Sequence, residues 1–511
     1  MSIKNPLPLL WLAPLLPGLW FYPVETLLIL LAANAVLLLT IGTTRIAAAR
    51  RRRPEIPGYS SSGEPFISIQ VPCYNEPPEL LRATLLSLAN LNYEHYEVIV
   101  LDNNTPDPTV YEPVRRYCDL LGDKFRFFHY DNVKGFKAGA LNIAHGLTDP
   151  RAEFILVIDA DYVLDADLIQ RALPHLARPN IGLIQFPQAY LNTNEENLGM
   201  QAEYEHFFGV YMNQANRCNC VLATGTVSFI RKNALEAAGL WRGASITEDV
   251  DLGLNIKEAG YEAVYVPAPL GRGLMPTDLN SMSVQRERWV YGNMQTLLRF
   301  LKTAGRYPLT SIRTIMLFLT AWFNFLAVPV AVLALCLVAL PMGWLGAEGD
   351  LVAQVALGSI TLELILSAVF FVVIRNRGFT SFTKRFAAFL THTGLSFEGA
   401  VNWIKVPFRP GMPFKRTNKF LKAGLQKLGL CKTYAFAAIT AASAAICFPG
   451  EMPEFSIALF VAALFVLCGV YLTRQLRATE RFSERFYQTS DQASQQVDRP
   501  TTDLPNHQTT F

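Results

Sequence analysis

Apolar residues are concentrated at the two ends of this chain, and a more polar stretch separates them. Near the N-terminus, residues 7–22 and 24–43 form two apolar runs, of which the first is short and interrupted by proline. A helix that crosses about 30 Å of hydrocarbon needs about 20 residues. Arg45 and the run Arg50 to Arg53 follow, and by the positive-inside rule they mark the cytoplasmic side. We therefore predict two N-terminal spans. A cleaved signal peptide is the alternative, because a lysine precedes the first apolar run.

The C-terminal apolar region predicts two further pairs of spans. They are residues 312–341 with 352–374, and residues 434–448 with 456–473. The basic residues between the two pairs indicate a second cytoplasmic surface. Residues 386–405 are apolar but interrupted by polar side chains, so they fit an interfacial helix better than a span. The prediction is six spans, two before the polar region and four after it, with both termini cytoplasmic.

Between the apolar ends, residues 65–270 alternate strand-like and helix-like patterns. Compact apolar or aromatic runs predict strands, and the segments between them predict helices: strands at Phe66–Pro72, Glu97–Leu101, Phe125–Tyr130 and Phe154–Ile158, and helices at 78–90, 109–121 and 136–147. This alternation is typical of a Rossmann-like, mostly parallel α/β sheet covered by helices. Ligands of such sheets bind at the carboxyl ends of the strands.

Composition changes this picture little. Hydrophobic residues make up 51% of the chain, which agrees with a membrane protein, and the net charge of +3 is too small to indicate a nucleic-acid partner. The eight cysteines form no disulfide framework, and Cys218-x-Cys220 lacks the second pair that a zinc site needs. The polar tail, residues 476–511, is expected to be disordered.

Acidic residues follow two of the predicted strands. Asp159-Ala160-Asp161 comes directly after one strand, and Asp102 ends another. A divalent cation with oxygen ligands stabilises the charge that grows on a nucleoside diphosphate as it leaves, and Asp102 is placed to contact a uracil or ribose. Turns also favour aspartate, so the D-x-D spacing alone leaves a structural interpretation open.

Two later motifs add a candidate base and a cation beside an aromatic ring. Thr247-Glu248-Asp249 precedes a helical pattern, where it can act as an N-cap with acids in the first turn or can deprotonate an acceptor hydroxyl. Within Gln285-Arg286-Glu287-Arg288-Trp289, on a predicted helix over 280–303, the first, fourth and fifth residues share one face. Arg288 suits a diphosphate and Trp289 a sugar ring, although an amphipathic helix at a membrane surface has the same pattern.

Over residues 65–305, these motifs resemble those of the processive, membrane-integrated family 2 glycosyltransferases. Three further runs belong to the same resemblance: Lys137-Ala-Gly-Ala-Leu-Asn142, Gln185-Phe-Pro-Gln188 and Thr224-Gly225-Thr226. That family contains the cellulose, curdlan and hyaluronan synthases. The resemblance implies a GT-A fold, an inverting single displacement, a UDP-sugar donor and Mg²⁺ or Mn²⁺. Phe414, Thr417 and Lys419 are also similar to a gating loop of bacterial cellulose synthases, over about 408–420, although Arg416 replaces an apolar residue there.

The resemblance implies a role for each matched residue. Asp249 is the expected general base, with Glu248 beside it. The other expected contacts are Asp102, Lys137, Asp159, Arg288 and Lys419 for the donor, Trp289, Thr224, Gly225, Thr226 and Gln285 for the acceptor, and Asp161 with Asp159 for the metal.

Two departures from the cellulose synthases bear on the product, and a third feature bears on regulation. Tyr162 follows the D-x-D motif where those enzymes often carry histidine, and Ala-Thr-Gly-Thr replaces a Cys-Gly-Ser type of run. Both changes favour a β-1,3 linkage over β-1,4. Arg477 and Arg481 have the spacing of a cyclic-di-GMP site, but the residues that follow are too few for a PilZ barrel, so we interpret the spacing as chance.

The expected function is a processive β-glucan synthase that uses UDP-glucose at the cytoplasmic face of a bacterial inner membrane and moves its product across. The expected domains are two spans in 1–44, a GT-A domain in 45–305, a channel region in 306–475 and the tail in 476–511. Partners would be the donor, the growing polysaccharide, the bilayer and, in some systems, accessory export proteins. The alternatives are a non-processive transferase acting on a lipid or oligosaccharide, a synthase of cellulose, hyaluronan or mannan, and an inactive scaffold or transporter.

Overall fold

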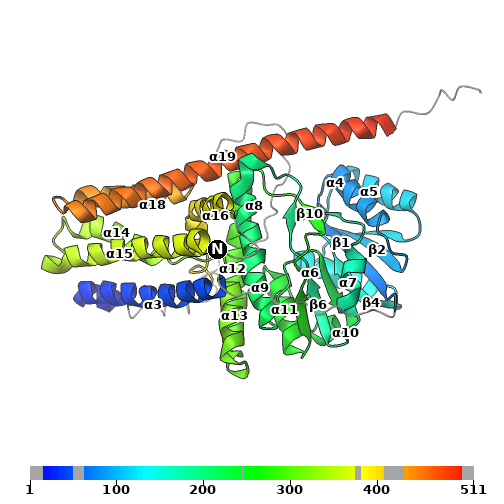
Figure 1. Ribbon diagram of the computed structural model, residues 1–511, viewed down its shortest axis with the longest axis horizontal. Helices are drawn as coiled ribbons and strands as arrows, with labels where there is room; N and C mark the ends of the chain where they lie inside the picture. Colours follow the sequence, from blue (N-terminus) through cyan, green and yellow to red (C-terminus); the bar gives the residue numbers. More distant parts are fainter. Residues whose placement is uncertain (1–14, 50–62, 244, 375–380, 408–430, 498–511) are drawn as a thin grey trace, which may run out of the picture.

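An α/β domain and a bundle of long helices lie next to each other along the longest axis of the molecule (Figure 1). The computed structural model describes residues 15–49, 63–243, 245–374, 381–407 and 431–497, with backbone alone from residue 482 onward. The first expected span is represented there by α2 (Leu15–Phe21), and the gating-like loop with Lys419 lies outside the described residues.

Seven strands form the central sheet of the α/β domain. In spatial order they are β3 (Phe125–Tyr130), β2 (Tyr96–Asn103), β1 (Phe66–Cys73), β4 (Ala152–Val157), β8 (Ser228–Arg231), β6 (Ile181–Gln185) and β9 (Glu262–Tyr265). Strand β8 is antiparallel to both of its neighbours, and the other paired strands are parallel. The predicted mostly parallel sheet is therefore confirmed, and a small second sheet joins β5 (Val163–Leu164), β10 (Gly271–Gly273) and β7 (Ala189–Tyr190).

Helices cover both faces of the main sheet because successive strand residues point to opposite faces. In β2, Val98 and Val100 pack toward α4 (Pro78–Ala89), α5 (Pro108–Leu121) and α7 (Leu168–Leu176). Ile99 and Leu101 pack instead against α6 (Phe136–Leu147). Helices α10 (Lys232–Ala237) and α11 (Glu248–Glu258) cover the rest of that second face. The result is a three-layer α/β/α domain.

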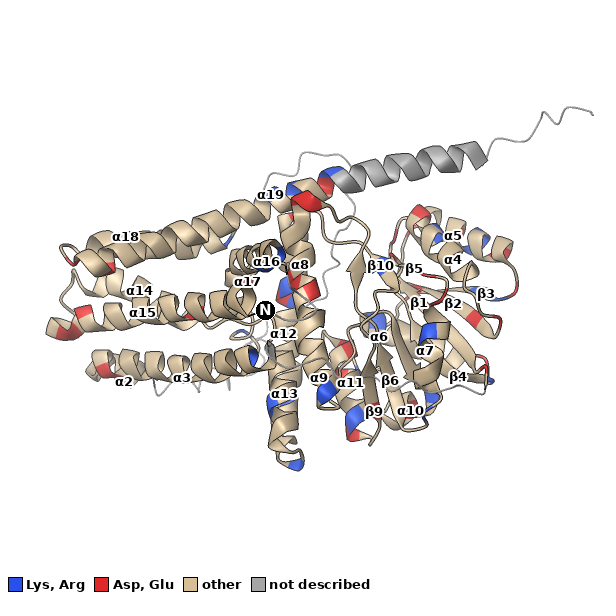
Figure 2. Cartoon of the chain, viewed as in Figure 1, with Lys and Arg blue, Asp and Glu red and all other residues tan. Residues whose placement is uncertain are grey.

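The apolar bundle contains α3 (Pro23–Ala49), α14 (Ala327–Ala339), α15 (Gly349–Ala368), α18 (Thr433–Ile446) and the long α19 (Met452–Val497), and Figure 2 shows few charged side chains along it. Three helical stretches of the described chain are long and apolar enough to cross a membrane: Pro23–Ala48, Gly346–Val373 and Met452–Arg481. Apolar side chains such as Ile29, Ile365 and Phe460 are exposed on them, as lipid-facing side chains would be. The count of six spans stays a prediction.

The expected span over 312–341 is interrupted. Helix α13 (Leu309–Leu319) ends before Thr320, and α14 begins at Ala327. In Figure 1, α13 runs across the direction of the bundle, along the line of α12 (Leu279–Leu301). The buried Arg45 guanidinium accounts for the break, because it donates hydrogen bonds to the carbonyl oxygens of Thr320 and of Phe323, the latter at 2.9 Å.

The predicted interfacial segment and the predicted disordered tail compare differently with the structure. The expected interfacial segment forms α16 (Phe382–Gly394) and α17 (Ser396–Val401), short helices between the bundle and the α/β domain. The tail is not irregular from residue 476 onward, because α19 continues to Val497. Just before the tail, Gln475 Oε1 accepts from Met200 N of α8 (Leu198–His206) at 2.8 Å, and within the tail Thr479 Oγ1 accepts from Asn197 Nδ2 at 2.8 Å.

Candidate active site

A cavity of about 400 Å³ opens at the carboxyl ends of β1, β2 and β4. Helix α12 and the break after α13 close its opposite side, so the α/β domain and the helices that follow it both contribute walls. Ten of the predicted site residues line it: Lys137, Asp159, Asp161, Thr224, Gly225, Glu248, Asp249, Gln285, Arg288 and Trp289. Residues distant in sequence thus meet where the strand-end rule placed them.

Lys137 ties the first turn of α6 to the D-x-D motif. Its Nζ lies 2.5 Å from Asp159 Oδ1 and donates to Gly225 O at 2.6 Å. Burial lowers the Lys137 pKa, but the carboxylates of Asp159 and Glu248 raise it more, so the net pKa is raised and the ammonium stays charged. With Arg288, it gives the cavity two cations that can bind a diphosphate.

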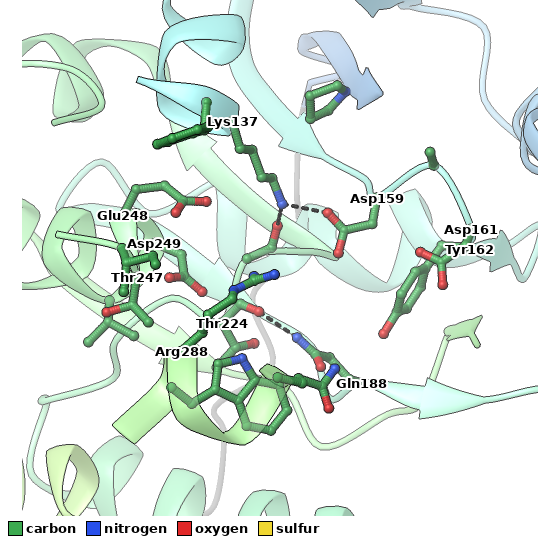
Figure 3. Close-up of a pocket in the computed structure, with 18 of the residues that line it drawn as sticks. Lys137, Asp159, Asp161, Tyr162, Gln188, Thr224, Thr247, Glu248, Asp249 and Arg288 are labelled. Atoms are coloured by element: carbon green, nitrogen blue, oxygen red, sulfur yellow. Dashed lines mark hydrogen bonds and ion pairs between the residues drawn. The ribbon is translucent and has the colours of Figure 1, made fainter. Parts of the chain in front are cut away.

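The two aspartates of the D-x-D motif fit a divalent metal as partial ligands. Figure 3 shows Asp159 beside Lys137 and Asp161 farther along the same turn. Asp161 Oδ2 accepts from Leu274 N at 3.0 Å, which fixes its orientation. The described residues contain no cluster of three or more side chains suited to a metal. Mg²⁺ and Mn²⁺ can be held by one or two carboxylates together with substrate phosphates and waters, so this pair is sufficient only with a bound donor.

Glu248 and Asp249 begin α11 and lie across the cavity from Asp161 and Tyr162 (Figure 3). The preceding Thr247 occupies the N-cap position without a side-chain capping bond, whereas Glu248 and Asp249 lie in the first turn, where acids are favoured. Burial, and then the neighbouring Glu248, raise the pKa of Asp249 to about 7. A carboxylate with that pKa can accept a proton at neutral pH.

Two glycines allow this close arrangement. Gly225 has φ +89°, and a Cβ there would lie 3.0 Å from Asp249 Oδ2. In α12, a Cβ on Gly292 would lie 2.5 Å from Thr247 Oγ1. The absence of side chains at these positions lets the Thr224–Thr226 segment and α12 approach the acidic pair.

Thr226 has a different place from the one predicted. It is fully buried, does not line the cavity, and its hydroxyl accepts from Asp159 N at 3.0 Å. It therefore supports the D-x-D turn rather than contacting an acceptor. Gln185 fixes the whole segment, because its side chain bonds to Thr224 N at 2.9 Å and to Thr226 O at 2.9 Å.

Asp102 also differs from the prediction, which was that its side chain would contact the donor directly. Its side chain is buried and is not part of the cavity wall. The carboxylate accepts from Thr105 Oγ1 at 2.6 Å and lies 2.7 Å from His129 Nδ1. The next residues, Asn103 and Asn104, line the cavity instead.

Aromatic rings from β7, α8, α12 and the break after α13 form another wall of the cavity. The Trp289 ring centroid lies 5.1 Å from that of Trp322 and 5.8 Å from that of Tyr204. The Tyr204 ring centroid also lies 4.7 Å from that of Tyr190, with the two rings tilted by 48°, and its hydroxyl donates to Gln285 Oε1 at 2.7 Å. Of these, the sequence motifs indicated Trp289 and Gln285. No sequence motif indicated that Trp322, Tyr204 or Tyr190 belongs to the site, and their aromatic side chains were the only hint. We call Tyr190, Tyr204, Trp289 and Trp322 the aromatic wall.

Comparison with known proteins assigns the family. Residues 68–239 match the model described as "Glycosyl transferase family 2", and residues 154–374 match "Glycosyl transferase family group 2". The chain belongs to the family 2 glycosyltransferases. Its mostly parallel sheet and the order of its motifs agree with the GT-A fold of that family.

Curated relatives of this family 2 enzyme include plant and bacterial polysaccharide synthases. It is 30% identical over 240 residues to a protein named "Probable glucomannan 4-beta-mannosyltransferase 3" from Oryza sativa subsp. japonica, covering 45% of this chain and 43% of that one. It is 27% identical over 270 residues to the "Cellulose synthase catalytic subunit [UDP-forming]" of Pseudomonas fluorescens (strain SBW25), covering 51% and 35%. The chain thus spans less than half the length of these relatives.

Among solved structures, this chain is similar to the mannosyltransferase PcManGT from Pyrobaculum calidifontis, a complex with GDP-Man and Mn²⁺. The identity is 15% and the TM-score 0.43, over 86% of this chain and 98% of that one.

Proposed function

We propose that this family 2 enzyme is an inverting, processive β-glycan synthase that transfers a hexose from a nucleotide-sugar donor to the end of a growing chain. One observation carries the proposal: a cavity with two cations, a D-x-D pair and an acidic pair of raised pKa also contains the aromatic wall. Groups suited to the nucleotide-sugar donor and a surface suited to an acceptor sugar therefore line the same cavity.

The donor half of the site follows from charge. Lys137 and Arg288 bind the diphosphate, and Asp159 with Asp161 hold Mg²⁺ or Mn²⁺ against it. When bound, the metal neutralises charge on the departing nucleoside diphosphate. Thr226 and Gln185 keep the D-x-D turn in place. Lys419, on the gating-like loop, is a further proposed contact to the diphosphate.

The acceptor half uses Asp249 as the general base. Its carboxylate takes the proton from the acceptor hydroxyl as that oxygen attacks the anomeric carbon, and the bond to the diphosphate breaks on the opposite face, which inverts the configuration. Burial, and then the neighbouring Glu248, keep the Asp249 pKa high enough for this task. Trp289 and Trp322 offer flat apolar faces for the acceptor sugar.

The product we propose is a β-glucan made from UDP-glucose at the cytoplasmic face, with β-1,3 linkages. Tyr162 supports this assignment, because it lines the cavity directly after the D-x-D motif. It also packs against Gly273, where a Cβ would lie 2.2 Å from its ring. Relatives named as 4-beta-mannosyltransferases make GDP-mannose the competing donor and a β-1,4 linkage the competing product.

A donor competition tests this. Membranes that carry the full chain are supplied with Mg²⁺ or Mn²⁺ and with radiolabelled UDP-glucose or GDP-mannose in parallel, and the product is digested with linkage-specific glycanases. Label from UDP-glucose in a product cut only by a β-1,3-glucanase supports the assignment. Label from GDP-mannose alone, or a product cut by a β-1,4-specific enzyme, contradicts it.

A further inference from the structure

A buried ion pair lies directly behind the aromatic wall. Arg286 on α12 and Glu203 on α8 have side chains that are 2% and 1% exposed, and Arg286 Nη2 is 2.6 Å from Glu203 Oε2. Neither residue lines the cavity, whereas their sequence neighbours Gln285 and Tyr204 do. The pair is therefore placed to act on the site without touching what binds there.

The guanidinium of Arg286 is held by this carboxylate and by two tryptophan rings. Its Cζ lies 4.0 Å from the Trp322 ring centroid and 5.3 Å from that of Trp289. Arg286 Nε and Nη1 have no hydrogen-bond partner among the described residues. A planar cation can stack on such rings, and stacking is stronger when it is desolvated. The position of the cation and the orientation of both rings are therefore coupled.

Glu203 is itself anchored to the membrane region. His392 Nδ1 on α16 lies 2.9 Å from Glu203 Oε1. Burial lowers the pKa of His392 despite this carboxylate, so the neutral ring donates its Nδ1–H. The next residue toward the N-terminus, Thr391, accepts from Gln475 of α19 at 2.9 Å. A continuous set of contacts thus joins the aromatic wall to α16 and α19.

We propose that Glu203 and Arg286 are positioning residues for the acceptor. The pair holds Trp289 and Trp322 in the orientation in which they bind the acceptor sugar, and it does so from outside the cavity. This inference rests on the proposed function, because it requires a sugar acceptor on the aromatic wall. If Glu203 loses its charge, the buried guanidinium loses its counter-ion and moves, and the rings move with it.

The test separates acceptor binding from donor binding. Full-length Glu203→Gln and Arg286→Lys variants are compared with Glu205→Gln, a control on the same helix. Glu205 pairs with Lys384 of α16 at 2.9 Å, with both side chains about a third exposed, and neither residue lines the cavity. This control removes another ion pair of α8, one that joins it to α16 rather than to α12, without reaching the aromatic wall.

Each purified variant is assayed with radiolabelled UDP-glucose and GDP-mannose and with a series of β-1,3-gluco-, cello- and manno-oligosaccharide acceptors. We expect Glu203→Gln to raise the acceptor KM about tenfold or more, while donor KM and donor hydrolysis to free sugar stay within twofold. Arg286→Lys keeps the cation but loses the planar stack, so its acceptor KM should lie between those of the wild type and Glu203→Gln. Glu205→Gln should match the wild type.

Three results would overturn the inference. Acceptor and donor KM rising together would indicate a general structural role, and an unchanged acceptor KM in a folded Glu203→Gln variant would show that the rings do not depend on the pair. Should Glu203→Gln fail to fold, an unchanged acceptor KM in Arg286→Lys would refute the inference equally. Wild-type protein that consumes neither donor would instead refute the proposed function.

Discussion

Asp249→Asn should abolish transfer, preserve donor binding and make the protein more stable at neutral pH. The substitution keeps the size of the side chain and removes its ability to take a proton. Since a general base contributes about 10²- to 10⁴-fold to rate, we expect kcat to fall by that order. Lys137, Asp159 and Arg288 are unchanged, and one negative charge near the diphosphate is lost, so donor affinity should be equal or higher.

The stability gain follows from the raised pKa of Asp249. Burial and Glu248 raise it from 3.8 to about 7. Each step of one in pKa corresponds to about 1.4 kcal/mol, so ionised Asp249 lowers the free energy of unfolding by up to roughly 4 kcal/mol. Because the pKa of this carboxyl is higher in the folded state than in the unfolded state, its ionisation destabilises the folded protein. Its penalty is absent below about pH 4, grows as the unfolded state ionises, and is complete above about pH 7.

Denaturation of purified wild-type and Asp249→Asn protein at pH 5, 6, 7 and 8, without donor or metal, measures this difference. The stability advantage of the variant should increase from pH 5 to pH 7 and then level off. Donor affinity is measured on the same samples by titration with UDP-glucose. An advantage that does not change with pH, or a wild type that is more stable at pH 8, would refute the assigned pKa. Loss of donor binding would show that Asp249 supports the structure of the site.

Further substitutions and conditions test other parts of the site. Gly225→Ala should lower kcat by at least tenfold, with donor KM less affected, because φ +89° disfavours alanine and its Cβ would lie 3.0 Å from Asp249 Oδ2; wild-type steady-state kinetics would contradict this. Trp322→Ala should raise the acceptor KM about tenfold while Trp322→Phe, which keeps a flat ring, should raise it less, and equal values for the two would argue against ring stacking. Chelation with EDTA should stop transfer and added Mn²⁺ or Mg²⁺ should restore it, whereas full activity in EDTA would remove the metal role of Asp159 and Asp161.

Much of the α/β domain could be predicted from sequence because β1, β2 and β4 are buried on both faces and the edge strand β3 is rich in aromatic residues. Their apolar runs are continuous and are separated by amphipathic helices, so β1 to β4 and α4 to α6 follow the pattern. Strand β8 gave no such signal, because it is only four residues long and pairs antiparallel with strands that are distant in sequence.

The site was partly predictable for a related reason. Strand ends meet at one edge of a parallel sheet, which brings Lys137, Asp159 and Asp161 together. The same rule predicted the correct edge of the sheet for Asp102. It could not predict that the Asp102 carboxylate bonds to Thr105 and lies beside His129 instead of facing the cavity. Whether a polar side chain faces a cavity or a buried partner depends on tertiary contacts.

The aromatic wall depended on contacts that no local pattern shows. Trp322 lies in what resembles one continuous apolar span, and the break beside it exists because Arg45 binds the carbonyl oxygens of Thr320 and Phe323. Similarly, the polar part of α19 stays helical where Gln475 and Thr479 find partners on other elements.

The central claim is that this enzyme adds many sugars in one cavity to the same polysaccharide chain before it releases that product. The most direct measurement is the product length distribution when purified protein, at a concentration far below that of an oligosaccharide acceptor, consumes a small fraction of radiolabelled UDP-glucose. Our account predicts long polymers while most acceptor molecules remain unextended. A distribution in which every acceptor, or a lipid-extractable product, gains a single sugar would contradict processive synthesis and would identify a non-processive transferase.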